Sequence, residues 1–151
     1  VDFQNTIIIA TSNANSDYIK AEIEKGTAVN DLSEQVKKKM TGFFKPELLN
    51  RFSGIIMFRP LLPADILAIT KINLEDLAET LRQAQGIEVE FDEATVKEIA
   101  RLGFDPAFGA RPLRAVISEK IRSALAEKIL RGEIARGGRI KVVFDNGLHF
   151  K

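Results

Sequence analysis

The spacing of apolar residues predicts two long helices in the second part of the chain. Residues 64–85 place apolar side chains on one broad face, at Ile66, Ile69, Leu77, Leu81 and Ala84. After Pro112 a second series recurs at every fourth position, at Leu113, Ile117, Ile121, Leu125 and Ile129. Because glycine commonly follows the last residue of a helix, Gly86 and Gly132 are expected to end these two helices.

Shorter segments around these helices carry the pattern of strands. Residues 87–91, IEVEF, alternate between apolar and charged side chains, which is typical of a strand with one solvent-exposed face. Asp92 is expected to cap a helix that runs through Leu102 and closes at Gly103. RIKVVF and LHF flank Asp145–Asn146–Gly147, and an Asn-Gly pair accepts the positive φ of a tight turn, so the sequence predicts a hairpin.

The first part of the chain has a different pattern, built on two short apolar runs. Residues 5–12, NTIIIATS, and residues 54–58, GIIMF, are short and apolar, as expected of buried strands. Helical segments connect them, an interrupted one over residues 16–40 and a short one after Pro46.

A proline-rich segment separates the two patterns. Both prolines of RPLLP, residues 59–63, stiffen the chain and stop regular structure. We therefore predict two domains. Residues 1–59 form a fragment of an α/β layer, and residues 60–151 form a small α+β unit with three helices and about three strands.

Composition excludes several classes of protein. The 151 residues include 22 basic and 21 acidic side chains, and a net charge of +1 argues against a protein built mainly to coat nucleic acid. The absence of cysteine excludes disulfides and thiolate metal sites, and the single histidine, His149, excludes a His-rich one. The apolar runs are too short to span a membrane and no signal peptide is evident, so we expect a cytoplasmic protein. The chain opens with valine and enters a strand pattern almost at once, so we also expect a piece of a longer protein.

Three polar residues are candidates for chemistry. Asn13 directly follows the first apolar run, and ligands bind at the carboxyl ends of strands in open parallel sheets, although a turn-forming asparagine would occupy the same place. Arg51 precedes the second run, where it could reach a ligand on a neighbouring subunit or simply pair with Glu47 at the surface. Arg111 precedes Pro112, a residue suited to the first position of a helix, where an anion is favoured. A guanidinium there suits phosphate oxygens, and a cation without such an anion is mildly unfavourable.

Two phosphate-site patterns are excluded. The phosphate-cradling loop G-x-x-x-x-G-K-[ST] does not occur in the sequence. IKVVFDN, residues 140–146, has the apolar-run-then-acid form of a Walker B strand, but no second acid follows Asp145 and the segment leads into the predicted hairpin. No Ser-His-Asp or paired-acid site stands out.

Taken together, three segments in this order resemble a known family. NTIIIATSN, FFKPELLNRF and FDPAFGARPLRAVI are similar to the C-terminal ATPase module of Clp-type AAA+ unfoldases, most of all to the second ring of ClpB-like disaggregases. The resemblance covers nearly all of the chain and is weakest over residues 16–40. It implies that residues 1–59 are the last part of the AAA+ large α/β subdomain and that residues 60–151 are the small C-terminal subdomain.

The resemblance also implies residue roles. Asn13 matches sensor 1, which positions the attacking water, Arg51 matches the arginine finger that reaches the next subunit's ATP, and Arg111 matches sensor 2. Gly109 and Ala110 are small enough to leave room for the nucleotide. The implied cofactor is ATP, with Mg2+ in the full-length parent, and none is expected to bind tightly to the fragment, which is expected to be inactive alone because the Walker motifs lie upstream.

The implied partners are unfolded or aggregated protein substrates, further copies in a homo-hexamer and a co-chaperone, with no nucleic acid and no membrane. The sequence departs from the family pattern at Asn15, where a glycine is common, and at Phe52–Ser53, where an Ile-Asp pair is usual. No Ile/Leu-Gly-Phe/Leu tripeptide occurs between residues 14 and 50, which favours a disaggregase over the ATPase subunit of a Clp-type protease. A non-catalytic AAA+ oligomerisation module is the alternative of a different class, and a DNA-acting AAA+ protein is a distant third.

Overall fold

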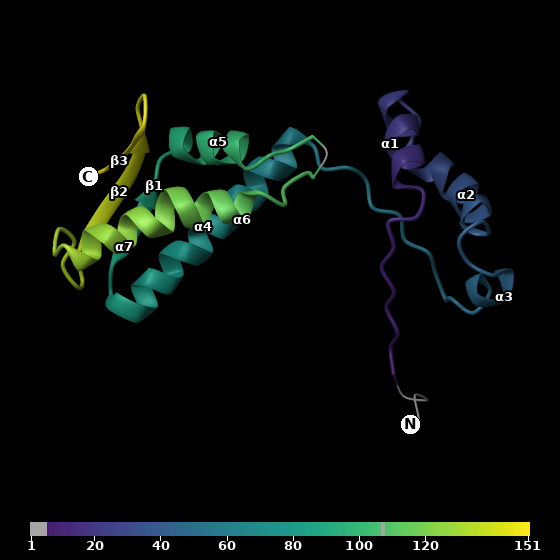
Figure 1. Cartoon of the computed structure of the whole chain (residues 1–151), viewed down its shortest axis with the longest axis horizontal. Coiled ribbons are helices and arrows are strands. Elements are labelled where there is room, and N and C mark those ends of the chain that lie inside the picture. The colour runs from purple at the N-terminus through teal and green to yellow at the C-terminus, as the bar shows by residue number, and fades with distance from the viewer. Residues whose placement is uncertain (1–5, 107) are drawn as a thin grey trace. The chain divides into compact units, whose positions relative to one another are not determined.

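The chain divides into two compact units. The computed structural model describes residues 6–106 and 108–151, and it separates Val1–Pro60 from Leu61–Lys151 (Figure 1). Each unit is described by itself below.

Three helices make up the regular structure described in the first unit. They are α1 (Ser16–Glu24), α2 (Val29–Met40) and α3 (Pro46–Leu49). α1 and α2 contact each other, with Leu32 and Val36 buried. The interruption predicted within residues 16–40 is confirmed, since Gly26 has a φ of 88° between the two helices.

The two strands predicted for this unit do not form. Residues 6–12 and 54–58 are irregular, and residue 5 lies outside the described residues. Their side chains are largely in solvent: Ile7, Ile8 and Ile9 are 92%, 72% and 84% exposed, and Ile56 and Phe58 are 82% and 84% exposed. A strand is stable only when another strand satisfies its N–H and C=O groups, and no strand is present among the described residues of this unit.

The second unit is a small α+β domain. It consists of α4 (Pro63–Gln85), β1 (Glu88–Phe91), α5 (Glu93–Leu102), a helix in three parts, β2 (Arg139–Phe144) and β3 (Leu148–Phe150). In the sheet, β2 lies between β1, to which it is parallel, and β3, to which it is antiparallel. The described residues therefore confirm the prediction of three helices and three strands.

The three-part helix contains a turn that the sequence pattern did not predict. Its parts are α6 (Leu113–Ile117), the π-helical turn η1 (Ser118–Arg122) and α7 (Ser123–Leu130). In an α-helix of 3.6 residues per turn, apolar residues at every fourth position drift around the axis by about 40° per step. A π-turn is wider and counteracts this drift. Leu113, Ile117, Ile121 and Leu125 all stay buried as a result.

One apolar core joins the helices to the sheet. α4 contacts β1, α5 contacts β2, and α4, α5 and α6 contact one another (Figure 1). The core consists of the following buried residues: Leu74, Leu77, Ile87, Ile99, Leu113, Ile117, Ile121, Leu125, Ile134, Ile140 and Val142. Glu88, Glu90 and Lys141 are exposed, so one face of the sheet is in contact with solvent, as predicted. Ala84, predicted on the apolar face of α4, is exposed near the helix end.

Candidate functional site

Arg111 lies in a tightly folded loop between α5 and α6. Asp105 and Gly109 form an antiparallel bridge, in which the Asp105 N–H donates to the Gly109 carbonyl at 2.9 Å and the Gly109 N–H donates back at 2.6 Å. The Asp105 carboxylate accepts the Phe108 N–H at 2.9 Å. Gly109 has a φ of 63°, a left-handed conformation that costs glycine little. The backbone of the loop therefore explains why a glycine occupies this position. Ala107 lies outside the described residues.

The loop leads directly into the helix, one residue later than predicted. Pro112 is the N-cap residue of α6 rather than its first helical residue, with φ −69° and ψ −17°, and its carbonyl accepts the Val116 N–H at 3.0 Å. Arg111 therefore lies one position before the cap. The shift is small because Pro112 already has helical backbone angles, so the assigned end depends on a single hydrogen bond.

Gly109, Ala110 and Arg111 line one open pocket within the second unit. The pocket has a volume of about 580 Å3 and its other lining residues are Leu61, Ile69, Asn73, Phe108, Leu113 and Arg114. None of the nine is acidic. Neither Arg111 nor Arg114 forms an ion pair or a side-chain hydrogen bond with another described residue, and both are exposed. The pocket thus combines an apolar wall with two uncompensated positive charges.

Sequence reasoning missed the contribution of α4 to this pocket. Asn73 is half-buried, and its side-chain N–H donates to the Ile69 carbonyl at 2.7 Å, which leaves its Oδ1 as an acceptor. A signal was present in the sequence, since Asn73 stands four residues from Ile69 and four from Leu77 on the apolar face of α4. A polar residue on this apolar face departs from the helix pattern, and this departure is the signal that sequence reasoning missed.

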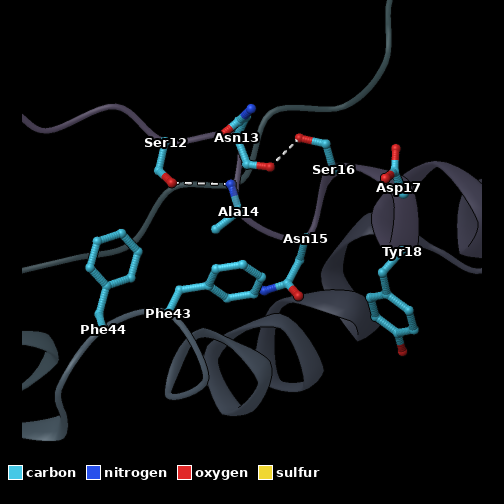
Figure 2. Close-up of a pocket in the computed structure, with 9 residues that line it drawn as sticks. All are labelled: Ser12, Asn13, Ala14, Asn15, Ser16, Asp17, Tyr18, Phe43 and Phe44. Carbon is cyan, nitrogen blue, oxygen red and sulfur yellow. Dashed lines mark hydrogen bonds between the residues drawn. The ribbon is translucent and has the colours of Figure 1, made fainter.

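Asn13 lies in the first unit, on a turn before α1. Its backbone carbonyl accepts the Ser16 N–H at 3.2 Å and the Ser16 hydroxyl at 2.7 Å (Figure 2). Its side chain is exposed and has no hydrogen bond to another described residue. The turn-forming interpretation therefore accounts for the backbone of Asn13, and its side-chain amide stays available. Since residues 6–12 form no strand here, Asn13 does not follow a strand as predicted.

A second open pocket surrounds this turn. It has a volume of about 610 Å3 and is lined by Ser12 to Tyr18, Phe43 and Phe44. Asn15 has a φ of 62°, so asparagine takes the left-handed conformation expected where the family pattern has glycine. Its buried Nδ2 has no hydrogen-bond partner and points toward the ring of Phe43 in Figure 2.

Arg51 follows α3 and does not line either pocket. Its N–H donates to the Leu48 carbonyl at 3.0 Å, and its side chain is exposed. The alternative of a surface pair with Glu47 does not occur, because Arg51 forms no ion pair with any described residue. The guanidinium is therefore uncompensated.

The rejection of Asp145 as a Walker B acid is supported. The Asp145 N–H donates to the Gly147 carbonyl at 2.9 Å, and Asn146 has a φ of 51° in the turn between β2 and β3. The hairpin is confirmed.

Residues 6–106 and 108–151 contain no cluster of three or more His, Asp or Glu side chains suited to holding a metal ion. None of the helices in this part of the chain has both the length and the apolar character needed to cross a lipid bilayer.

Comparison with known families defines the class of protein. Residues 61–142 match the model of the C-terminal, D2-small domain of ClpB protein, and residues 1–55 match that of an AAA domain of the Cdc48 subfamily. Both are AAA+ families, as the resemblance in the sequence implied. The chain belongs to the ClpB family, which confirms the predicted family, and the small α+β subdomain of the predicted fold class is confirmed as well.

Individual relatives agree. The chain is 37% identical to the chaperone protein ClpB of Rhodopirellula baltica over 145 residues, or 96% of the chain. It is 40% and 42% identical to the proteins of the same name from Meiothermus ruber and Rickettsia bellii, over 142 residues or 94% of the chain. In each case the match spans 16% of the relative's length.

Proposed function

We propose that this chain is the C-terminal part of an ATP-dependent protein unfoldase or disaggregase. The observation that carries the proposal is the pocket of the second unit, in which Arg111 stands uncompensated beside Gly109 and Ala110 in a member of the ClpB family. The curated relatives are named chaperone proteins, so unfolded or aggregated proteins are the proposed substrates. The proposed assembly is a homo-hexamer in the cytoplasm.

The proposed domains follow the family. Residues 1–59 are the last part of an AAA+ large α/β subdomain, and residues 60–151 are the small subdomain. The high exposure of Ile7–Ile9, Ile56 and Phe58 supports the first assignment, because β-branched and aromatic side chains of this kind are suited to a sheet that covers them.

The residues of the pocket in the second unit fit a nucleotide. Leu61, Ile69 and Phe108 offer apolar contact to a planar base, and the Arg111 guanidinium suits phosphate oxygens. Bound ATP would supply the free energy of phosphoryl transfer. Residues of the full-length protein outside this pocket would hold the Mg2+ ion. Arg111 is proposed to bind phosphate oxygens and so to couple the second unit to the state of the nucleotide.

The two residues of the first unit have complementary proposed roles. Asn13 offers a free side-chain amide that can orient a water molecule. Arg51 offers a free, permanently charged guanidinium that can stabilise charge on a phosphoryl group held by the next subunit.

The test is made in the full-length protein that contains this chain. Arg51→Ala is expected to lower kcat for ATP hydrolysis by roughly a thousandfold while nucleotide affinity stays within about twofold, because a finger acts on the transition state. Arg122→Ala removes another exposed arginine and serves as the control. Turnover of Arg51→Ala at the wild-type rate would show that the finger assignment is wrong.

A further inference from the structure

Two arginines of the second unit lie three positions apart on the same pocket. Arg111 and Arg114 both line it, both are exposed, and no acidic side chain lines it with them. Pro112 has helical angles, so the spacing resembles that of side chains on one helix face. Like charges at such spacing repel each other by a few tenths of a kcal/mol. An anion bound between them makes the electrostatic energy of the arrangement favourable.

Most arginines on the regular elements of this unit are neutralised instead. Arg82 and Arg101 pair with glutamates three residues earlier on their own helices. Arg131, directly after α7, pairs with Glu127, and Arg139 pairs with Glu88 on the neighbouring strand. The pairing also shifts the pKa of an acid: hydrogen bonds from Arg82 and then Gln83 lower the pKa of Glu79 to about 2. Within the described residues, Arg111 and Arg114 lack any such partner.

Arg122 provides an internal comparison. It lies on the same three-part helix as Arg114, is exposed, and likewise has no partner among the described residues, but it does not line the pocket. An unpaired arginine is therefore not by itself a sign of a site. What distinguishes Arg114 is that it shares an acid-free pocket with Arg111 and with an apolar wall.

We infer that Arg114 is a second phosphate-contacting residue, which binds the phosphate chain of the nucleotide together with Arg111. The inference rests on the proposed function, which concerns Arg111 alone. A nucleoside triphosphate carries several anionic oxygens along its chain, more than a single guanidinium fork engages. Two planar forks in one pocket can each form paired N–H···O bonds to different oxygens.

The experiment uses the 151-residue chain labelled with 15N and the NMR signals of arginine Nε–Hε groups. The chain is titrated with ATP at millimolar concentration, with inorganic tripolyphosphate and with adenosine. The Nε signals of Arg111 and Arg114 are expected to shift with ATP and tripolyphosphate but not with adenosine, while that of Arg122 stays in place.

Variants make the test quantitative. In the full-length protein that contains this chain, Arg114→Ala is expected to raise the Kd for ATP about tenfold, the effect of losing one charged hydrogen-bonding contact. Arg114→Lys should recover only part of the loss, because lysine has charge without the planar fork. Arg122→Ala should leave the Kd unchanged. Far-UV circular dichroism of each variant verifies that the fold is intact, as expected for exposed positions.

The outcomes separate the two proposals. If Arg111 responds to ATP while Arg114 is silent and Arg114→Ala binds normally, this inference is wrong and the proposed role of Arg111 stands. If Arg114→Ala and Arg122→Ala weaken binding equally, the effect is general charge and the inference is again wrong. If neither Arg111 nor Arg114 responds, the inference and the assignment of Arg111 to the phosphates both fail.

Discussion

Gly103 closes α5 at a place where the backbone of α6 comes very near, and replacing it with alanine is expected to destabilise the second unit. A Cβ atom at this position would lie 2.5 Å from Cδ1 and 2.9 Å from Cα of Leu113, and 3.0 Å from the carbonyl oxygen of Ile99. Rotation of the Leu113 side chain cannot relieve the contact with its Cα, and Leu113 is itself only 1% exposed. The first residue of α6 has to move.

The sign of the effect is decided by two magnitudes. Gly103 has a φ of −88°, which alanine adopts readily, so the usual gain from replacing glycine is about 0.4–1 kcal/mol. Overpacking a filled core costs about 1–3 kcal/mol. The close contacts are with backbone atoms and a fully packed side chain, so the cost is expected to prevail, with a net loss of about 1–2 kcal/mol in the free energy of unfolding.

Urea unfolding of the 151-residue chain, followed by amide NMR signals of the second unit, measures this change separately from the first unit. Gly147→Ala is the matched control, because its Cβ would meet nothing nearer than the Nε2 atom of His149 at 3.9 Å. The control is expected to stay within about 0.5 kcal/mol of the wild type. A Gly103→Ala variant as stable as the wild type, or more so, would refute the close approach of α5 and α6. Since Leu113 follows Arg111 by two residues, the same variant is also expected to bind ATP more weakly.

Two further predictions concern the turns of the second unit. The Asp92 carboxylate caps α5 by accepting the Thr95 N–H at 2.7 Å. Hydrogen bonding from Thr95, first from its side chain and then from its backbone, holds the pKa of Asp92 below its ordinary value of 3.8. A lowered pKa in the folded state means that this stabilisation is complete above the unfolded pKa and is lost as the pH falls through the folded one. Asp92→Asn keeps the cap without titrating, so the wild type's extra stability over this variant should shrink below about pH 4 in urea unfolding series; a difference independent of pH would contradict this origin. Asn146 has a φ of 51° in the hairpin, so Asn146→Gly should be tolerated and Asn146→Ala should cost about 1 kcal/mol, measured as the unfolding midpoint; equal stability of the two variants would contradict the strain argument.

Much of the second unit was predictable because its signals are local. The apolar spacing of residues 113–129, the Asp92 cap and the Asn-Gly turn each depend on neighbours along the chain. The helix, apart from its π-turn, the cap and the hairpin all form as expected. The segment with Gly109, Ala110 and Arg111 is also contiguous, so its residues necessarily lie together. Local pattern failed for the two strands of the first unit, since residues 6–12 and 54–58 have strand-like composition but no strand among the described residues to pair with.

The remaining features of the site depend on contacts between distant segments. Asn73 and Ile69 reach the pocket only because α4 packs against α6, some forty residues later in the chain. The role inferred for Arg114 likewise depends on the acid-free pocket, which no spacing rule reveals.

By itself, the sequence determined the family, the helices and strands of the second unit, and the loop that carries Arg111. Tertiary structure alone decided three things: the parallel pairing of β1 with β2, the π-turn that keeps the stripe of every fourth residue against the core, and the joining of α4 to the arginine loop. The physical reason is that periodicity and capping act over a few residues. Strand pairing, close packing and the compensation of charge depend on which distant segment supplies the partner.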